Sequence, residues 1–192
     1  MHKPGVRGLT LIELMVTIAV LVILISIGVP SFQGTMNSSR LSSSANELTA
    51  ALQVARAEAI RRNRSVVLCR SVTLATCAAG DEWGGWLVFV DTDGDGAVSA
   101  GEEIIKTGAI AAPLVVRASA AISSRGHVVT FLPSGVARGA DESALLNATL
   151  SICTPSTNPA QNVREVLISF GGRTTVRGIG TGGVCDTAPA DT

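Results

Sequence analysis

One uninterrupted apolar stretch dominates the N-terminal part of the chain. Residues 9–29, LTLIELMVTIAVLVILISIGV, hold a single charge in 21 positions, that of Glu13, and follow a short segment that carries Lys3 and Arg7. An α-helix of this length rises about 31 Å, which matches the hydrocarbon core of a bilayer at about 30 Å. We therefore predict a membrane-spanning helix whose basic flank lies in the cytoplasm.

The pattern beyond this stretch predicts more helix and then a sheet. Residues 33–44 are poor in helix formers, but residues 46–63 are rich in them, and Leu48 and Leu52 recur there at helical spacing. From Ser65 onward, short β-branched runs such as HVVTFL and EVLISF alternate with glycine, proline and asparagine, as in antiparallel strands. The expected fold class is α+β, a long N-terminal helix packed on a β-rich globular head.

These changes in hydrophobic pattern and residue type divide the chain into four segments. They are a basic leader at 1–8, a transmembrane or filament-core helix at 9–30, an amphipathic continuation of the helix at 31–64, and a β-rich head at 65–192. The tail after Cys185 carries no strand pattern, and we expect it to be frayed.

The composition excludes some classes of function. Lysine plus arginine and aspartate plus glutamate number 15 each, so no net field attracts nucleic acid or acidic lipid to the whole surface. The two histidines are His2, in the leader, and His127, and neither forms a recognisable nucleophile motif with Ser134. The sequence therefore indicates a protein that is not an enzyme.

Glu13 is unusual because it places a carboxylate inside the apolar stretch. Such a charge costs on the order of 2 to 3 kcal/mol in a membrane helix, so we expect it to have a partner. Cleavage between Gly8 and Leu9 would supply one, because it removes the basic leader and leaves an α-amino group on Leu9. The ammonium of one chain can then neutralise Glu13 of a neighbour and set the stagger of the packed helices.

Residues 8–14, GLTLIEL, closely resemble the processing motif of type IV prepilins and type II secretion pseudopilins. The resemblance implies that a prepilin peptidase cuts after Gly8 and methylates the amino group of Leu9, and that Glu13 acts in assembly. Pro30 stands where this family has its helix-bending proline. Leu9 replaces the phenylalanine that usually follows the cut, and we expect processing to survive because both residues are apolar.

The four cysteines, Cys69, Cys77, Cys153 and Cys185, all follow the apolar stretch and are expected in an oxidising compartment. Four cysteines allow three pairings, and spacing favours Cys69 with Cys77 and Cys153 with Cys185. The alternative is a zinc site of four thiolates, although the sequence has no CxxC pair.

The segment DTDGDG at 91–96 matches the spacing of a calcium-binding loop. Asp91, Asp93, Asp95 and Glu102 would supply the oxygen ligands, which makes calcium the candidate cofactor. However, the loop follows a predicted strand rather than a helix. The alternative is therefore a polar hairpin loop in which aspartate and glycine supply only turn geometry.

The segment WGGWLVFVD at 83–91, together with the acidic loop and the pair Gly101-Glu102, resembles the head signature of the GspH/FimT family of minor pilins and pseudopilins. Its two tryptophans are also what the core of a sheet packed on a helix needs, since they are large apolar anchors. The resemblance implies a pilin-like fold and a structural role in a filament.

Two arginines near the C-terminus carry a second implication of this resemblance. Some FimT-type minor pilins bind DNA through arginines of a glycine–arginine motif, and Gly172-Arg173 with Arg177 is similar to it, although three residues separate the arginines here instead of one. On a strand they share a face and lie roughly 13 Å apart, enough to contact two phosphates. We expect no stacking aromatic residue beside them.

Together, these features indicate a minor pilin or pseudopilin, a structural subunit of a type II secretion pseudopilus or a type IV pilus. Its expected partners are the other pilins of the filament, a prepilin peptidase and the bacterial inner membrane, with the N-terminus cytoplasmic and the head periplasmic before assembly. The alternative is a FimT-like DNA-binding minor pilin that acts in DNA uptake for natural transformation.

Overall fold

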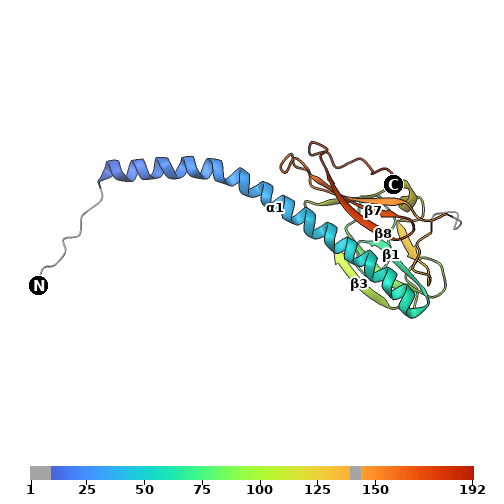
Figure 1. The fold of residues 1–192 in the computed structure, drawn as a ribbon. Helices are drawn as coiled ribbons and strands as arrows, with labels where there is room; N and C mark the ends of the chain where they lie inside the picture. The colour runs from blue at the N-terminus through green and yellow to red at the C-terminus, as the bar shows by residue number, and fades with distance from the viewer. Residues whose placement is uncertain (1–9, 139–143) are drawn as a thin grey trace, which may run out of the picture. The chain divides into compact units, whose positions relative to one another are not determined.

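A computed structural model describes residues 10–138 and 144–192, except for the side chains of residues 27–31. The chain divides into two compact units, Met1–Met36 and Asn37–Thr192, and helix α1, Leu11–Arg62, contributes to both (Figure 1). The remaining elements all belong to the second unit. The expected class, α+β with a long N-terminal helix, is confirmed.

Helix α1 continues through the serine-rich stretch without a break. Leu41 lies in the middle of that stretch and is fully buried, as are Leu48 and Leu52 further along the same helix. Packing of an apolar face supplies most of the stability of a helix in a folded protein, so these contacts outweigh the weak helix propensity of the serines.

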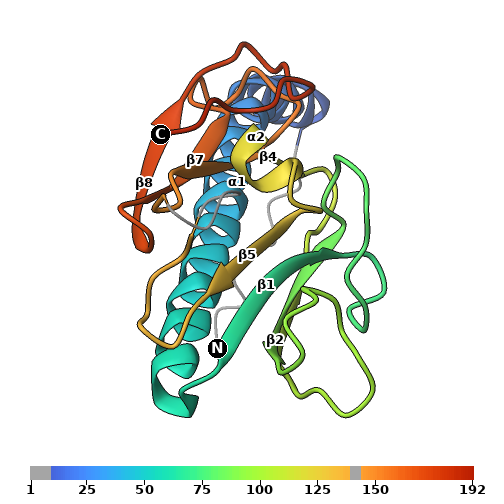
Figure 2. The ribbon, with the colours of Figure 1, turned by 90° about the vertical axis from the view of Figure 1, so that its right-hand side faces the viewer.

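The second unit contains two four-stranded antiparallel sheets, with strand orders β3-β2-β1-β5 and β4-β6-β7-β8. In Figure 2 the later part of α1 runs along both of them. The elements after α1 are β1 Ser65–Ser71, β2 Gly85–Asp91, β3 Ile104–Ala109, β4 Val115–Ala118, α2 Ala120–Ser123, β5 Val128–Phe131, β6 Ala148–Cys153, β7 Val163–Ser169 and β8 Arg173–Ile179.

One core joins α1 to both sheets. Leucine and alanine side chains of α1 pack there against Trp86 and Phe131 from the first sheet and against Leu150 and Val166 from the second. Trp83 and Trp86 are both buried in this core, which agrees with their expected role as apolar anchors. Because α1 contributes to the same core as both sheets, the head cannot form its interior without the helix.

Strands β1 and β2 are buried on both faces. A second cluster of Val67, Cys69, Leu87 and Phe89 lies on the face away from the main core, and Cys77 and Val98 pack against it. These two covering residues come from the loop after β1 and from the acidic loop after β2. This double burial explains why β2 shows an unbroken apolar run instead of an alternating one.

The C-terminal tail is held against the second unit, so the expectation that it is frayed was wrong. Asp191 accepts a hydrogen bond from the backbone N–H of Ala121 at 3.0 Å, and the hydroxyl of Thr192 donates to the carbonyl of Ile168 at 3.0 Å. These contacts join residues far apart in the sequence, and a composition rich in alanine, aspartate and threonine does not reveal them.

Across residues 10–138 and 144–192, we find no helix that combines the length and the apolar character needed to cross a membrane. The transmembrane segment expected at 9–30 includes Leu9 and the side chains of residues 27–30, which lie outside the described residues. That segment stays a prediction.

Candidate functional site

The N-terminal motif is described from Thr10 onward, so Gly8, Leu9 and the side chain of Pro30 lie outside the described residues. Glu13 lies in the first turn of α1. Its Oε2 accepts a hydrogen bond from the backbone N–H of Thr10 at 3.4 Å, and the Thr10 hydroxyl oxygen accepts one from the N–H of Glu13 at 3.3 Å. This reciprocal pair is a capping box, a local role of Glu13 that we missed although the spacing T-x-x-E signals it.

The first unit leaves its apolar side chains uncovered. The large hydrophobic residues from Leu11 to Ile25 are each 51–76% exposed, and they lie on every side of the helix. They are Leu11, Ile12, Leu14, Met15, Val16, Ile18, Val20, Leu21, Val22, Ile23, Leu24 and Ile25. A helix that is apolar all round is stable only when lipid or other protein covers it.

The acidic loop brings three aspartates together. Carboxylate oxygens of Asp91, Asp93 and Asp95 lie within 4.8 Å of one another, close enough to share one cation. Asp91 is the buried member, and its two oxygens accept hydrogen bonds from the backbone N–H groups of Gly94 and Gly96 at 2.7 and 3.2 Å. Burial raises the pKa of Asp91 above its ordinary value in spite of these bonds.

Glu102 lies outside this group of carboxylates. Its Oε1 accepts a hydrogen bond from the backbone N–H of Thr92 at 2.6 Å, and its Oε2 accepts one from the N–H of Ser99 at 2.9 Å. Burial acts to raise the pKa of Glu102, but the bonds from Ser99 and Thr92 outweigh it and hold that pKa below its ordinary value. In this arrangement Glu102 stabilises the loop through hydrogen bonds and does not join the three aspartates as a cation ligand.

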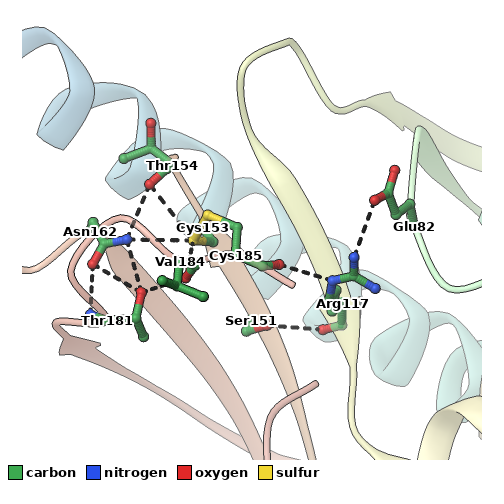
Figure 3. The surroundings of a disulfide bond; sticks show 9 residues. All are labelled: Glu82, Arg117, Ser151, Cys153, Thr154, Asn162, Thr181, Val184 and Cys185. Atoms are coloured by element: carbon green, nitrogen blue, oxygen red, sulfur yellow. Dashed lines mark hydrogen bonds and ion pairs between the residues drawn. A yellow bond between two sulfur atoms is a disulfide. The ribbon is translucent and has the colours of Figure 1, made fainter. Parts of the chain in front are cut away.

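Both disulfides join the cysteines that spacing favours, Cys69 with Cys77 and Cys153 with Cys185. All four thiols are used, so the zinc alternative is excluded. Figure 3 shows that the second disulfide sits in a polar network. Buried Asn162 donates to the carbonyl of Thr154 at 3.1 Å and to the hydroxyl of Thr181 at 3.0 Å, and Arg117 donates to the carbonyl of Cys185 at 2.9 Å.

Arginines at the end of α1 are held by acidic partners. Glu58 accepts hydrogen bonds from Arg61 at 2.6 Å and from Arg62 at 2.6 Å, and Arg62 also pairs with Glu103 at 2.5 Å. The hydrogen bonds from Arg61 and then Arg62 lower the pKa of Glu58 to about 2. These ion pairs stabilise the C-terminal turn of α1.

The two candidate DNA-binding arginines differ in their surroundings. Both lie on the edge strand β8, and Thr174 between them contacts Gln53 of α1 at 2.6 Å, so the arginines, at odd positions, point away from α1. Arg177 donates to Oε2 of Glu165 at 2.6 Å, whereas Arg173 makes no ion pair within the described parts of the chain.

One exposed aromatic residue precedes β8, three positions before Arg173 in the sequence, and the expectation that no aromatic ring stacks beside the arginines stays a prediction. Phe170, in the turn between β7 and β8, is 75% exposed. Its backbone has a positive φ of 50°, and its N–H donates to the side-chain oxygen of Asn147 at 3.0 Å. We overlooked Phe170 because the run EVLISF predicts a strand, in which its ring would be buried.

His127, the histidine of the head, is only 6% exposed and has no partner for Nδ1 in the described structure. Burial, and then the nearby charge of Arg70, lower its pKa below the ordinary value. These surroundings suit a neutral ring in the interior of the head.

A long N-terminal helix packed on antiparallel sheets defines the class of pilin-like proteins. Residues 44–172 match the family model of type II transport protein GspH, and residues 3–29 match the prokaryotic N-terminal methylation motif. This chain belongs to the GspH family, whose members are minor pilins and pseudopilins of type IV filament systems.

Solved structures that are similar to this chain include those of two proteins. The type IV minor pilin FimU of Pseudomonas aeruginosa is 23% identical with a TM-score of 0.52, and the match covers 73% of this chain and 90% of FimU. The minor pseudopilin EpsH of the Vibrio cholerae type 2 secretion system is 15% identical with a TM-score of 0.46, over 74% of this chain and 98% of EpsH. No curated protein sequence matches this chain.

Proposed function

We propose that this chain is a minor subunit of a type II secretion pseudopilus or a type IV pilus. A prepilin peptidase cuts it between Gly8 and Leu9, and the N-terminal helix anchors it in the inner membrane with the head in the periplasm. The observation that carries the proposal is the uncovered apolar surface from Leu11 to Ile25. Lipid covers this surface before assembly, and the helices of neighbouring subunits cover it afterwards.

Glu13 then has two successive partners. Its capping contact with Thr10 satisfies the carboxylate within its own chain. After cleavage, the ammonium of Leu9 in a neighbouring subunit offers a stronger, charge-assisted partner at the same end of the helix. The proposal therefore assigns the capping role of Glu13 to the free subunit and its ionic role to the filament.

The N-terminus of the protein from native membranes tests the processing step. Mass spectrometry should find a chain that begins at N-methylated Leu9. A Gly8→Ala variant serves as the control and should retain the leader. A native chain that begins at Met1, or one cut after Ser31, would contradict the proposal.

Two variants separate the capping role of Glu13 from its charge. Glu13→Gln removes the charge but keeps a side chain that fits a capping box, whereas Thr10→Ala removes the box and keeps the charge. We expect Glu13→Gln to be processed but excluded from sheared filaments, and Thr10→Ala to assemble. Normal assembly of Glu13→Gln would refute the ionic role.

Calcium binding by Asp91, Asp93 and Asp95 is a separate proposal, supported by the convergence of their oxygens. Calcium takes six to eight oxygen ligands, so carbonyls and water must complete the shell. Isothermal titration of the full chain in detergent should give heat at millimolar calcium that Asp93→Asn removes. Absence of heat in the wild type would end this proposal.

DNA binding at the β7–β8 hairpin is the second candidate function. The observation that favours it is exposed Phe170 in the same hairpin as Arg173, which makes no ion pair with the described residues. An aromatic face can stack on a base while the arginine contacts a phosphate, so the site suits weak, salt-dependent binding of single strands. Arg177 contributes less, because Glu165 offsets its charge.

A mobility-shift assay with the full chain in detergent tests this candidate. Arg173→Ala and Phe170→Ala should weaken the binding of single-stranded DNA more than Arg177→Ala does. Arg164→Ala is the control, since Arg164 contacts Gln161 on the other side of the sheet. Unchanged binding in an Arg173→Ala, Arg177→Ala double variant would exclude this site.

A further inference from the structure

A small pocket lies beneath the C-terminal tail, on the face of the second sheet that is turned away from α1. Val166 and Ile168 of β7 point into the core that contains α1, so Glu165 between Arg164 and Val166 points to the opposite face. The pocket measures about 130 Å³, and its lining includes Ser151, Val163, Glu165, Ile179, Val184 and Pro189. The last two of these residues belong to the segment that follows β8 and form the roof.

Glu165 is the charged group of this pocket and is only 5% exposed. Its Oε2 accepts a hydrogen bond from Arg177 at 2.6 Å, and no other hydrogen bond to its carboxylate occurs in the described structure. A carboxylate has about four acceptor positions, so most of its capacity is unused. Arg177 offsets part of the Glu165 charge through its bond to Oε2, and because the Arg177 side chain is 60% exposed, water weakens this compensation.

Two hydroxyl groups on the pocket wall also act as acceptors. Ser151 donates its proton to the carbonyl of Arg117 at 3.4 Å, and Thr181 donates its proton to the carbonyl of Val184 at 2.6 Å. With these protons engaged, the remaining lone pairs of Ser151 and Thr181 can only accept hydrogen bonds. Val163 and Ile179 supply the apolar part of the lining. The complementary ligand is therefore rich in donors, positively charged and partly aliphatic.

We propose that this pocket binds a primary ammonium group on an alkyl chain, which is the chemistry of a lysine side chain from another protein. Its volume equals roughly four water molecules, which is the size of a short aminoalkyl group. An ammonium group brings three donors and one positive charge to Glu165. A guanidinium group is planar and wider, so the pocket selects lysine over arginine.

The lysine comes from a protein of different sequence. This chain has only Lys3 and Lys106, and Lys3 lies in the leader that processing removes. Lys106 lies over the ring of Trp86, 5.9 Å from its centroid. The removal of Lys3 and the identity of the partner as another filament subunit both rest on the proposed function. The argument from the chemistry of the pocket does not depend on that function.

The disulfide between Cys153 and Cys185 keeps the roof in place. Both cysteines also line the pocket, and Val184 in the roof precedes Cys185 directly. The Cys69–Cys77 disulfide belongs to the other sheet and has no part in this site. A Cys153→Ser, Cys185→Ser double variant should therefore lose ammonium binding, and a Cys69→Ser, Cys77→Ser double variant should retain it.

Titration of the full chain in detergent with n-butylamine, followed by NMR of the Ile179 and Val184 methyl groups, tests the pocket. We expect saturable shifts in the wild type. Glu165→Gln should weaken binding by at least about tenfold, because the carboxylate that pairs with the ammonium is lost. Arg177→Gln should bind more tightly, because the arginine that competes for Glu165 is gone. Glu82→Gln is the matched control, because Glu82 pairs with Arg117 outside the pocket and its loss should change nothing. The neutral analogue 1-butanol should not saturate.

Several results would overturn the proposal. Shifts that do not saturate, or equal affinity in the wild type and Glu165→Gln, would remove the site. If Glu165→Gln does not fold, binding to Arg177→Gln that is equal to or weaker than wild type would remove it instead.

A lysine with a blocked backbone, Nα-acetyl-lysine N-methylamide, distinguishes the sources of the amine. We expect it to give the same shifts as n-butylamine. Binding of n-butylamine alone would overturn the lysine assignment and leave a site for a free amine. Because these measurements involve no filament, they succeed or fail independently of the processing and assembly experiments.

Discussion

Two parts of one helix show opposite environments. From Leu11 to Ile25 the large apolar side chains of α1 are at least half exposed, whereas Leu41, Leu48 and Leu52 of the same helix are fully buried against two sheets. The two parts differ in which molecule supplies the surface that covers their apolar side chains. The later part of α1 finds its partner within this chain, and the earlier part requires lipid or other chains.

The later part of α1 therefore belongs to the folding of the head, whereas we propose that the earlier part acts in assembly. Substitutions in the later part should change the free energy of unfolding. Substitutions in the earlier part should leave it unchanged and act only on the filament. The pair of leucine variants tests this separation directly. The predictions that follow it, in order of decreasing effect, test the contacts that fold the head.

A matched pair of leucines gives the sharpest test. Leu48→Ala should lower the free energy of unfolding of the head by about 2 to 5 kcal/mol, because it leaves a cavity in the main core. Leu21→Ala should change it by less than about 0.5 kcal/mol, because Leu21 is exposed. Urea unfolding of the full chain in detergent, followed by tryptophan fluorescence, measures both. Similar losses in the two variants would break the comparison.

The sheet surface that covers the later part of α1 is tested at Gly108 of β3. A Cβ atom at this position would overlap the ring of Trp86, which packs in the core that contains α1. Gly108→Ala should therefore destabilise the head by about 1 to 3 kcal/mol. At Gly84 a Cβ atom would make only an ordinary contact with Val72, at 3.6 Å. Gly84→Ala is thus the control, and equal thermal midpoints for the two variants would contradict the predicted overlap.

His127 makes the stability of the head depend on pH. Its pKa in the folded state lies below the ordinary value of 6.5, chiefly because the ring is buried. Below pH 6.5 the unfolded chain takes up a proton that the folded chain does not, so stability is greatest above this pH and falls toward the folded-state pKa. Unfolding midpoints between pH 5 and 8 should show this slope, and His127→Gln should flatten it. The same slope in both proteins would assign the effect to other groups.

The smallest effect concerns the C-terminal end of α1. NMR titration should show that the Glu58 carboxyl group in the wild type titrates near pH 2. The network that lowers this pKa stabilises the fold above pH 4.5, and its contribution is lost as the pH falls through about 2. An Arg61→Gln, Arg62→Gln double variant should move the titration toward 4.5, whereas Arg40→Gln should not. A carboxyl group that titrates near 4.5 in the wild type would show that the pairs are open in solution.

Sequence patterns predicted the larger features of the fold. The switch from apolar to amphipathic helix and then to β-branched runs indicated α+β, and the spacing of the cysteines favoured the two disulfides that occur. Sequence patterns were less informative for polar side chains that can form a hydrogen bond or an ion pair with more than one group. Glu102 fits the spacing of a calcium ligand, but its carboxylate accepts hydrogen bonds from backbone N–H groups of the loop. Arg177 fits a DNA-binding motif but pairs with Glu165.

The sequence by itself determined the apolar N-terminal helix, the processing motif and the family, because these depend on residues close together along the chain. Only the tertiary structure decided which part of α1 finds a partner within the chain, and only it placed the tail over Glu165. Those outcomes depend on residues that are distant in sequence and become neighbours when the strands pair. The burial of side chains and the charge compensation between distant residues exist only after the chain has folded.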